Sequence, residues 1–168
     1  MSKLLASRTA QRKLCAEFVF NYNDWATDSV DGTKKTFGST AALADPSSVV
    51  SGLAAGTGIV LDCIPMPIGA VICGGEVIVE TAYVGIGAGA TLNLGIAGTT
   101  SGLISALDLD AAAAGARTAL TLTAPLLANG GQNLRLTTAG LTATATAGKV
   151  RVRVEYTIDG KSDEVVIA

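Results

Sequence analysis

Glu76 and Glu80 are the two residues whose spacing comes closest to a catalytic arrangement. They lie four residues apart in a segment that reads as a β-strand, so both side chains project from the same face. Two carboxylates so placed can hold a cation, or can cleave a glycosidic bond when several ångströms separate them. The alternative is a solvent-exposed or subunit-contact face on which this pair lies opposite Arg151 and Arg153. We favour this second interpretation.

Histidine is absent from all 168 residues. The commonest general base, the usual activator of serine and cysteine nucleophiles and the commonest zinc ligand are therefore missing. Asp108 and Asp110 stand two residues apart, but a helix explains them better, with Asp108 as N-cap and Gly115 at the far end. We therefore expect no enzymatic activity, no catalytic residues, no cofactor and no metal site.

The remaining candidate motifs lack the spacing that chemistry requires. Residues 85–90 are rich in glycine, but they do not have the G-x-G-x-x-G spacing of a dinucleotide-binding turn, and a strand rather than a helix follows. Cys15, Cys63 and Cys73 are odd in number and lie in apolar surroundings. They are typical of buried free thiols in a reducing compartment, although a Cys63–Cys73 disulfide across a hairpin stays open.

The composition favours a chain that assembles with others. Aromatic residues make up only 4% of the sequence, so apolar burial comes mainly from small side chains. Each of these buries little area, and burial against partner subunits adds to it.

The net charge of −2 is too small for nucleic-acid or acidic-membrane binding by the whole domain. Since residues 59–84 are interrupted by charges and prolines, and residues 1–16 show no signal peptide, we expect a soluble protein made in a cytoplasm.

Two segments far apart in the sequence position the charged residues. In residues 148–160 apolar and charged side chains alternate, which gives a strand one apolar and one charged face. Residues 68–82 are more apolar, as expected of a strand that is covered on both faces. Within this segment, Gly74-Gly75 predicts a β-bulge or a close backbone approach. We expect the two segments to be the central strands of a β-sandwich.

Further strands are predicted between turn signals along the chain. Residues 101–107 are ambiguous, and residues 39–58 read as a long loop with 41–44 as an alternative helical stretch. Asn129-Gly130-Gly131 and Asp159-Gly160 are turns of the hairpin type. The predicted strands cover residues 14–22, 33–37, 57–64, 71–82, 90–94, 118–123, 134–138, 150–158 and 164–167.

Many short strands with one minor helix predict an all-β fold. We expect a jelly-roll-like β-sandwich with one short helix at 108–115 and an extended N-terminal arm. Residues 1–22 are expected to form the arm and the first strand, and residues 23–168 a single β-sandwich domain. Asn23 to Gly32 reads as polar and turn-like.

Residues 64–82 carry a pattern of proline, apolar residues, Gly-Ala-Val, Gly-Gly, a strand and Thr-Ala. Residues 90–95, the segment 108–115 and the strand 149–158 closing at Asp159-Gly160 follow in order. Over roughly residues 57–168 the chain resembles the head decoration, or cement, proteins of tailed bacteriophages. The resemblance implies a jelly-roll-like sandwich on the outer surface of the phage head, made in the bacterial host cytoplasm.

The resemblance also implies partners. Such proteins bridge neighbouring subunits of the major capsid protein and associate with themselves, with a trimer favoured over a dimer; direct nucleic-acid and membrane contacts are not expected. Many simultaneous contacts multiply a modest affinity. The basic residues before the first acidic one and three aromatic residues near the first strand are the expected contact residues, since aromatics concentrate binding energy at interfaces. They are Lys3, Arg8, Arg12, Lys13, Tyr22, Trp25 and Phe37.

Alternatives remain for these residues and for the function. The basic arm also fits a solvated terminus, and the aromatic residues also fit the filling of one end of the sandwich. A tail- or fibre-associated sandwich that contacts the host surface is a second structural hypothesis. A carbohydrate-binding jelly roll is a third, which ranks behind because sugar sites use exposed aromatic residues and the chain has seven aromatics in total.

Overall fold

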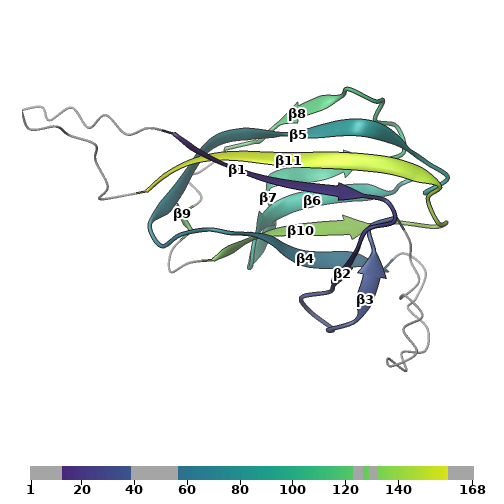
Figure 1. The fold of residues 1–168 in the computed structure, drawn as a ribbon, viewed down its shortest axis with the longest axis horizontal. Coiled ribbons are helices and arrows are strands. Elements are labelled where there is room, and N and C mark those ends of the chain that lie inside the picture. Colours follow the sequence, from purple (N-terminus) through teal and green to yellow (C-terminus); the bar gives the residue numbers. More distant parts are fainter. Residues whose placement is uncertain (1–12, 39–56, 123–126, 129–131, 159–168) are drawn as a thin grey trace, which may run out of the picture.

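Two long strands, β5 (Ala70–Val84) and β11 (Ala147–Ile158), pair antiparallel through most of their length. Their pairing confirms the two segments that the sequence singles out as central, with Val77 opposite Val152. The computed structural model describes residues 13–38, 57–122, 127–128 and 132–158. Within these residues the architecture is all-β, a sandwich of antiparallel sheets (Figure 1).

The first sheet has the strand order β1-β11-β5-β8, and the short β9 also pairs with β5. The second sheet has the order β4-β10-β6-β7, and β2 and β3 form a separate hairpin. In Figure 1 this hairpin projects from one end of the sandwich, below β1 and β4. The remaining bounds are β1 Leu14–Asn21, β2 Trp25–Thr27, β3 Lys34–Thr36, β4 Thr57–Pro65, β6 Thr91–Ile96, β7 Thr99–Asp108, β8 Arg117–Ala119, β9 Leu127–Ala128 and β10 Asn133–Ala139.

The core lies between the inner faces of the two sheets. Alternate residues of β11 are buried there, which confirms the apolar face expected from the alternating sequence. On the facing sheet, every second residue of the strands β6 and β10 is likewise buried, and several of these residues are leucines. The core side chains are almost all aliphatic, and the fully buried ones among them include Val150, Val152, Val154, Leu92, Leu94, Leu134 and Leu136.

The outer face of β5 is not covered. Its residues alternate between buried and half-buried, with Glu76, Ile78 and Glu80 on the half-buried side. The expectation that this more apolar segment is covered on both faces is therefore wrong for the isolated chain.

The predicted helix at 108–115 is also wrong, and the described residues contain no helix. The capping signal itself is present, since the Asp108 carboxylate accepts hydrogen bonds from the N–H groups of Asp110 and Ala111. The chain does not continue as a helix, because it pairs with β5. The N–H of Gly115 donates to the carbonyl of Val79, and the N–H of Val79 donates to the carbonyl of Ala116. Pairing with the long central strand therefore takes up the backbone at the end of this segment.

Smaller differences concern strand limits. The ambiguous segment 101–107 belongs to β7, and the turn-like segment 23–32 contains the short β2. The N-terminal arm, the 41–44 stretch, the strand at 164–167 and the turns at 129–131 and 159–160 lie outside the described residues. No helix in the described part of the chain is long and apolar enough to cross a membrane.

The glycine pair in β5 confirms both predicted features. Gly74 lies opposite Glu155 and Ile72 opposite Tyr156, so Cys73 is the extra residue of a β-bulge. Gly75 has a φ of 136°, and a Cβ added to it would lie 2.2 Å from the carbonyl oxygen of Arg153. The close approach of the β11 backbone to Gly75, two residues beyond the bulge, therefore requires glycine at this position.

Candidate interaction site

A groove opens on the side of the sandwich where the edge strands β1 and β4 approach each other. Its volume is about 480 Å³. Aromatic and aliphatic side chains line most of it, and carboxylates and an amide lie among them. The lining residues are Phe18, Val19, Phe20, Asn23, Asp24, Trp25, Ala26, Phe37, Leu61, Asp62 and Cys63.

Three phenylalanine rings form the apolar wall of this groove. Phe20 stacks on Phe37 with ring centroids 4.3 Å apart, and Phe18 lies 6.1 Å from Phe37. Such pairs stabilise beyond their area of burial, by about 1 kcal/mol each. Phe37 is only 2% exposed and belongs to the core. For Phe37 the alternative interpretation applies: it fills one end of the sandwich, and only its groove-facing side is available to a partner.

Trp25, in contrast to Phe37, is largely exposed. It is 58% exposed, on β2 beside the groove, and the Lys34 ammonium lies 5.0 Å from its ring centroid. A cation over an indole face is attracted by the negative face of the ring, and at exposed sites the contact typically contributes about 0.5–1 kcal/mol. Of the three predicted aromatic contact residues, Trp25 is thus the one with a large exposed surface; Tyr22 is half-buried against the core.

The predicted basic contact residues fall largely outside the described part of the chain, which begins at Lys13. Lys13 is exposed, and its ammonium lies 3.3 Å from the Glu155 carboxylate on β11. Lys3, Arg8 and Arg12 precede the described residues, so their role stays a prediction.

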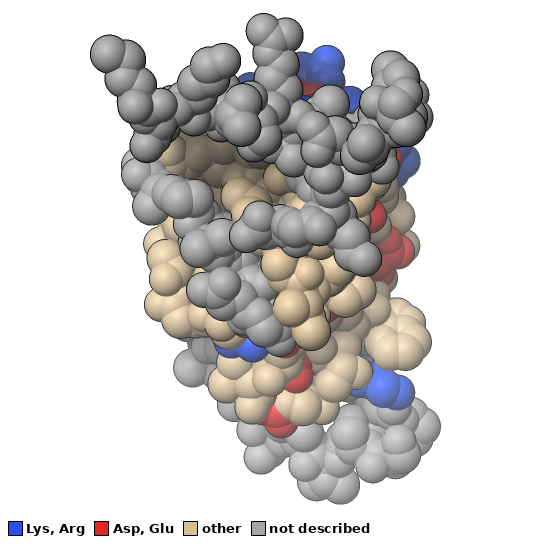
Figure 2. Space-filling model, turned by 90° about the vertical axis from the view of Figure 1, so that its left-hand side faces the viewer, with Lys and Arg blue, Asp and Glu red and all other residues tan. Residues whose placement is uncertain are grey.

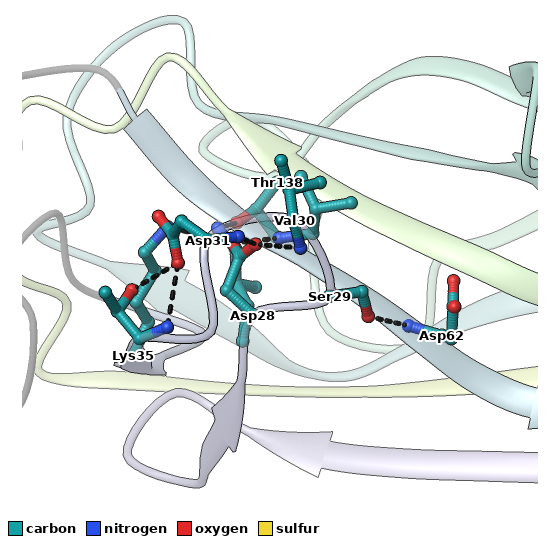
Figure 3. Close-up of polar contacts among 10 residues, drawn as sticks. Asp28, Ser29, Val30, Asp31, Lys35, Asp62 and Thr138 are labelled. Atoms are coloured by element: carbon teal, nitrogen blue, oxygen red, sulfur yellow. Dashed lines mark hydrogen bonds and ion pairs between the residues drawn. The ribbon is translucent and has the colours of Figure 1, made fainter.

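A buried charge cluster, which sequence reasoning missed, positions the hairpin that carries Trp25. The Lys35 ammonium lies 2.8 Å from Asp28 and 2.7 Å from Asp31, and Lys35 is 1% exposed (Figure 3). Asp28 also accepts hydrogen bonds from the N–H groups of Val30 and Asp31, which folds the turn. The Asp-Ser-Val-Asp-Gly sequence at 28–32 is typical of a turn that is closed by a side-chain carboxylate, and this sequence is the signal from which the turn could have been predicted.

The same turn covers the free edge of β4. The N–H of Val60 donates to the Asp28 carboxylate, and the Ser29 N–H donates back to the carbonyl of Val60. The N–H of Asp62 donates to the Ser29 hydroxyl, as Figure 3 shows. Backbone groups that an edge strand leaves open are thus satisfied, and the hairpin is fixed against the sandwich. Trp25 is consequently held beside the groove by a rigid support.

The pKa values of this cluster reflect its pairing. Burial tends to raise the pKa of Asp28, but the hydrogen bonds from Lys35 and three backbone N–H groups hold it below its usual value. The hydrogen bond from Lys35 lowers the pKa of Asp31 to about 2. Burial lowers the pKa of Lys35, yet its two carboxylate partners outweigh this and raise it. All three groups are therefore charged at neutral pH.

Glu76 and Glu80 take part in ion pairs on the outer face of the first sheet. Glu80 lies 2.6 Å from Arg151 and 2.7 Å from Lys149, and Glu76 accepts two hydrogen bonds from Arg117. Hydrogen bonds from Arg117 and from Lys149 lower the pKa values of Glu76 and Glu80, respectively. The interpretation of this pair as a surface face opposite arginines is thus confirmed for Arg151. Neither carboxylate is free to act as a general acid.

Figure 2 views the molecule from one end, where Lys, Arg, Asp and Glu side chains lie at the top, along the right-hand margin and toward the bottom. Between them the described surface in this view is largely uncharged. Within the described ranges, no three His, Cys, Asp or Glu side chains lie together in a way that could hold a metal ion. The three cysteines are free thiols, with Cys15 exposed and Cys63 and Cys73 half-buried.

Comparison with known proteins supplies one structural likeness. A chain of the cyanophage Pam1 capsid asymmetric unit superposes with a TM-score of 0.57 and 20% sequence identity, covering 94% of this chain and 94% of that chain. No family model matches the sequence, and no curated protein is significantly similar to it. The likeness extends over nearly the whole of both chains, and at this level of identity it shows a shared fold.

Proposed function

We propose that this protein is a non-enzymatic structural component of a bacteriophage virion that decorates and stabilises the head. The observation that carries the proposal is the likeness to a chain of a cyanophage capsid asymmetric unit over 94% of both chains. The side chains agree with it, because the two carboxylates best placed for catalysis are engaged in ion pairs with Arg117, Arg151 and Lys149.

The proposed attachment surface is the groove together with Trp25. An exposed indole on a rigidly anchored hairpin, next to an apolar cavity, is the arrangement that interface hot spots use. The proposed partner is the major capsid protein on the outer surface of the head, where one decorating protein bridges neighbouring subunits. Several copies engaging together, as a homo-oligomer, would raise the overall affinity well above that of one contact.

Trp25→Ala tests this surface. Since the ring is 58% exposed, its removal should leave the melting temperature nearly unchanged, while binding to undecorated capsids weakens by at least about tenfold. Ile68→Ala is the matched control, because Ile68 is 75% exposed and does not line the groove. Equal binding by the two variants would remove the groove from the proposal. Failure of the unmodified chain to bind any capsid would remove the head function itself.

The alternative locations give different numbers of copies. A head protein should be present at hundreds of copies per particle and appear at capsomer junctions in a cryo-electron map, whereas a tail- or fibre-associated sandwich should be present at a few. Trp25 beside Asn23 and Asp24 also favours a sugar-binding site as a second candidate. Quenching of tryptophan fluorescence by oligosaccharides would support that candidate, and its absence together with capsid binding would exclude it.

A further inference from the structure

Strand β1 is an edge strand of the first sheet, paired with β11 on one side among the described strands. The pairing runs in regular register over all eight residues, with Phe18 opposite Val152 and Phe20 opposite Val150. The N–H of Tyr22 donates to the carbonyl of Gly148, the next pair in this register. Because hydrogen-bonded residues alternate in an antiparallel ladder, even-numbered residues of β1 face β11. The backbone groups of the odd-numbered residues point to the open side.

The far end of this open edge is closed by the chain itself. The N–H of Asn21 donates to the Asp24 carboxylate at 2.7 Å, and the carbonyl of Asn21 accepts from the N–H of Asp24 at 3.2 Å. Residues 13–19 precede this closed end, and among them the apolar Leu14 and Val19 are 42% and 37% exposed. Natural edge strands are usually protected by a bulge, a proline, a covering segment or charged side chains. A segment covers β4, whereas β1 is regular, contains no proline and has one charge of each sign, Lys13 immediately before it and Glu17 within it, which can pair with each other across a two-fold axis.

We propose that the edge of β1 pairs antiparallel with β1 of a second copy of this chain, about a two-fold axis at Cys15. Cys15 then lies opposite Cys15 of the partner subunit, and Lys13 lies opposite Glu17 of the partner subunit. The two-fold axis repeats the second contact, so two opposite-charge pairs flank the centre. A pair of this kind directly across a ladder is stabilising. The interface is isologous and closes at two subunits.

Charge and the closed end together select this register. An axis at Glu17 places two carboxylates directly opposite each other, which is unfavourable, and also brings Lys13 to the blocked position Asn21. An axis at Ala16 places Lys13 opposite Val19 and leaves Glu17 opposite Cys15, without an ion pair. The axis at Cys15 is the register in which both charges of the edge find a partner.

The pairing would also extend a pattern already present within one chain. Lys13 contacts Glu155, and Glu17 contacts Arg151, both across to β11 on the outer face of the first sheet. Pairs between Lys13 and the partner subunit's Glu17 join the two charged faces into one. The proposal concerns the isolated protein and does not depend on a role in the virion; it favours a dimer over the trimer implied by the family resemblance.

Charge reversal tests the proposal on the full chain. Lys13→Glu and Glu17→Lys each place like charges opposite each other in a homodimer, and each should raise the dimer dissociation constant by at least about tenfold. An equimolar mixture of the two variants restores opposite charges at both contacts. Light scattering over a dilution series should therefore show monomers for each variant alone and dimers for the mixture. Monomers of the unmodified chain at all concentrations, or variants that dimerise unchanged, would overturn the proposal.

The native cysteine provides an independent readout. Backbones of a hydrogen-bonded antiparallel pair lie about 5.5 Å apart at Cα, within the span of a disulfide. Mild oxidation with diamide should therefore link the dimer through Cys15, and Cys15→Ser should abolish the product while the control Cys73→Ser does not. Each charge-reversal variant alone should lose the link, and their mixture should regain it. A link that is insensitive to these charges would show random collision and count against the register.

Discussion

The Lys35 ammonium lies 2.8 Å from the Asp28 carboxylate, with the two side chains 1% and 2% exposed. This pair joins the turn of the β2–β3 hairpin to the edge of β4, because the same carboxylate accepts the N–H of Val60. This pair therefore attaches the turn of the β2–β3 hairpin to the sandwich. The position of Trp25 beside the groove depends on it.

Asp28→Asn should destabilise the fold strongly. It leaves a buried ammonium with the partly exposed Asp31 as its remaining carboxylate, and breaking a buried ion pair typically costs about 3 kcal/mol or more. Urea unfolding followed by circular dichroism measures the change. Asp31→Asn is the control, since that side chain is 39% exposed and Asp28 still pairs with the ammonium, so its loss should cost clearly less than the loss of the Asp28 charge. Equal losses in the free energy of unfolding for the two variants would contradict the prediction that the buried carboxylate contributes more.

Stability should fall in acid as the same carboxylates are protonated. Asp28 has a folded-state pKa below the usual 3.8, and hydrogen bonds from Lys35 and Thr33 lower that of Asp31 to about 2. As pH falls, the unfolded chain binds these protons first, so the stabilisation present above about pH 4 is lost progressively toward pH 2. Urea titrations at several pH values measure the slope. Asp31→Asn should show a shallower slope in this range, and a parallel slope would contradict the assignment.

Gly75→Ala and Gly74→Ala should differ although the residues are adjacent. A methyl group at Gly75 meets the Arg153 carbonyl at 2.2 Å with φ at 136°, and nothing there can move without breaking the β5–β11 ladder. A methyl group at Gly74 meets the end of the flexible Glu155 side chain at 3.2 Å. We expect Gly75→Ala to lower the free energy of unfolding by about 2–4 kcal/mol and Gly74→Ala by less than about 1 kcal/mol. Thermal melts of both variants check this.

The three thiols should react at different rates. Cys15 is exposed on the edge strand, whereas burial raises the pKa of Cys63 to about 12. Because the thiolate is the reactive form, a disulfide reagent near pH 8 should modify Cys15 first and Cys63 only slowly. Mass spectrometry of digests taken over time identifies the order. Equal early labelling of Cys63 would show that the groove wall around it opens readily.

Local periodicity was sufficient to predict much of the framework. The alternating residues 148–160 predicted β11, and the more apolar residues 68–82 predicted its neighbour β5. The pair Gly74-Gly75 predicted a bulge or a close backbone approach, and the structure has a bulge at the adjacent Cys73 and a close approach at Gly75. The spacing of Glu76 and Glu80 predicted a common face toward an arginine. These features follow from the period of two of a strand, which a sequence displays directly.

The tertiary structure decided what depends on contacts between distant segments. Asp108 carries a correct capping signal, but the backbone of Val79, on another strand, pairs with the N–H of Gly115 and the carbonyl of Ala116 at the end of this segment. Residue type also could not separate Phe37, which is buried, from Trp25, which is exposed, because burial depends on which strand packs against each. Lys35 reads as a surface residue in sequence, and only the approach of Asp28 and Asp31 makes its burial favourable. Sequence alone determined the two central strands and the inward apolar face of β11; the packing of distant segments determined the groove, its support and the open edge.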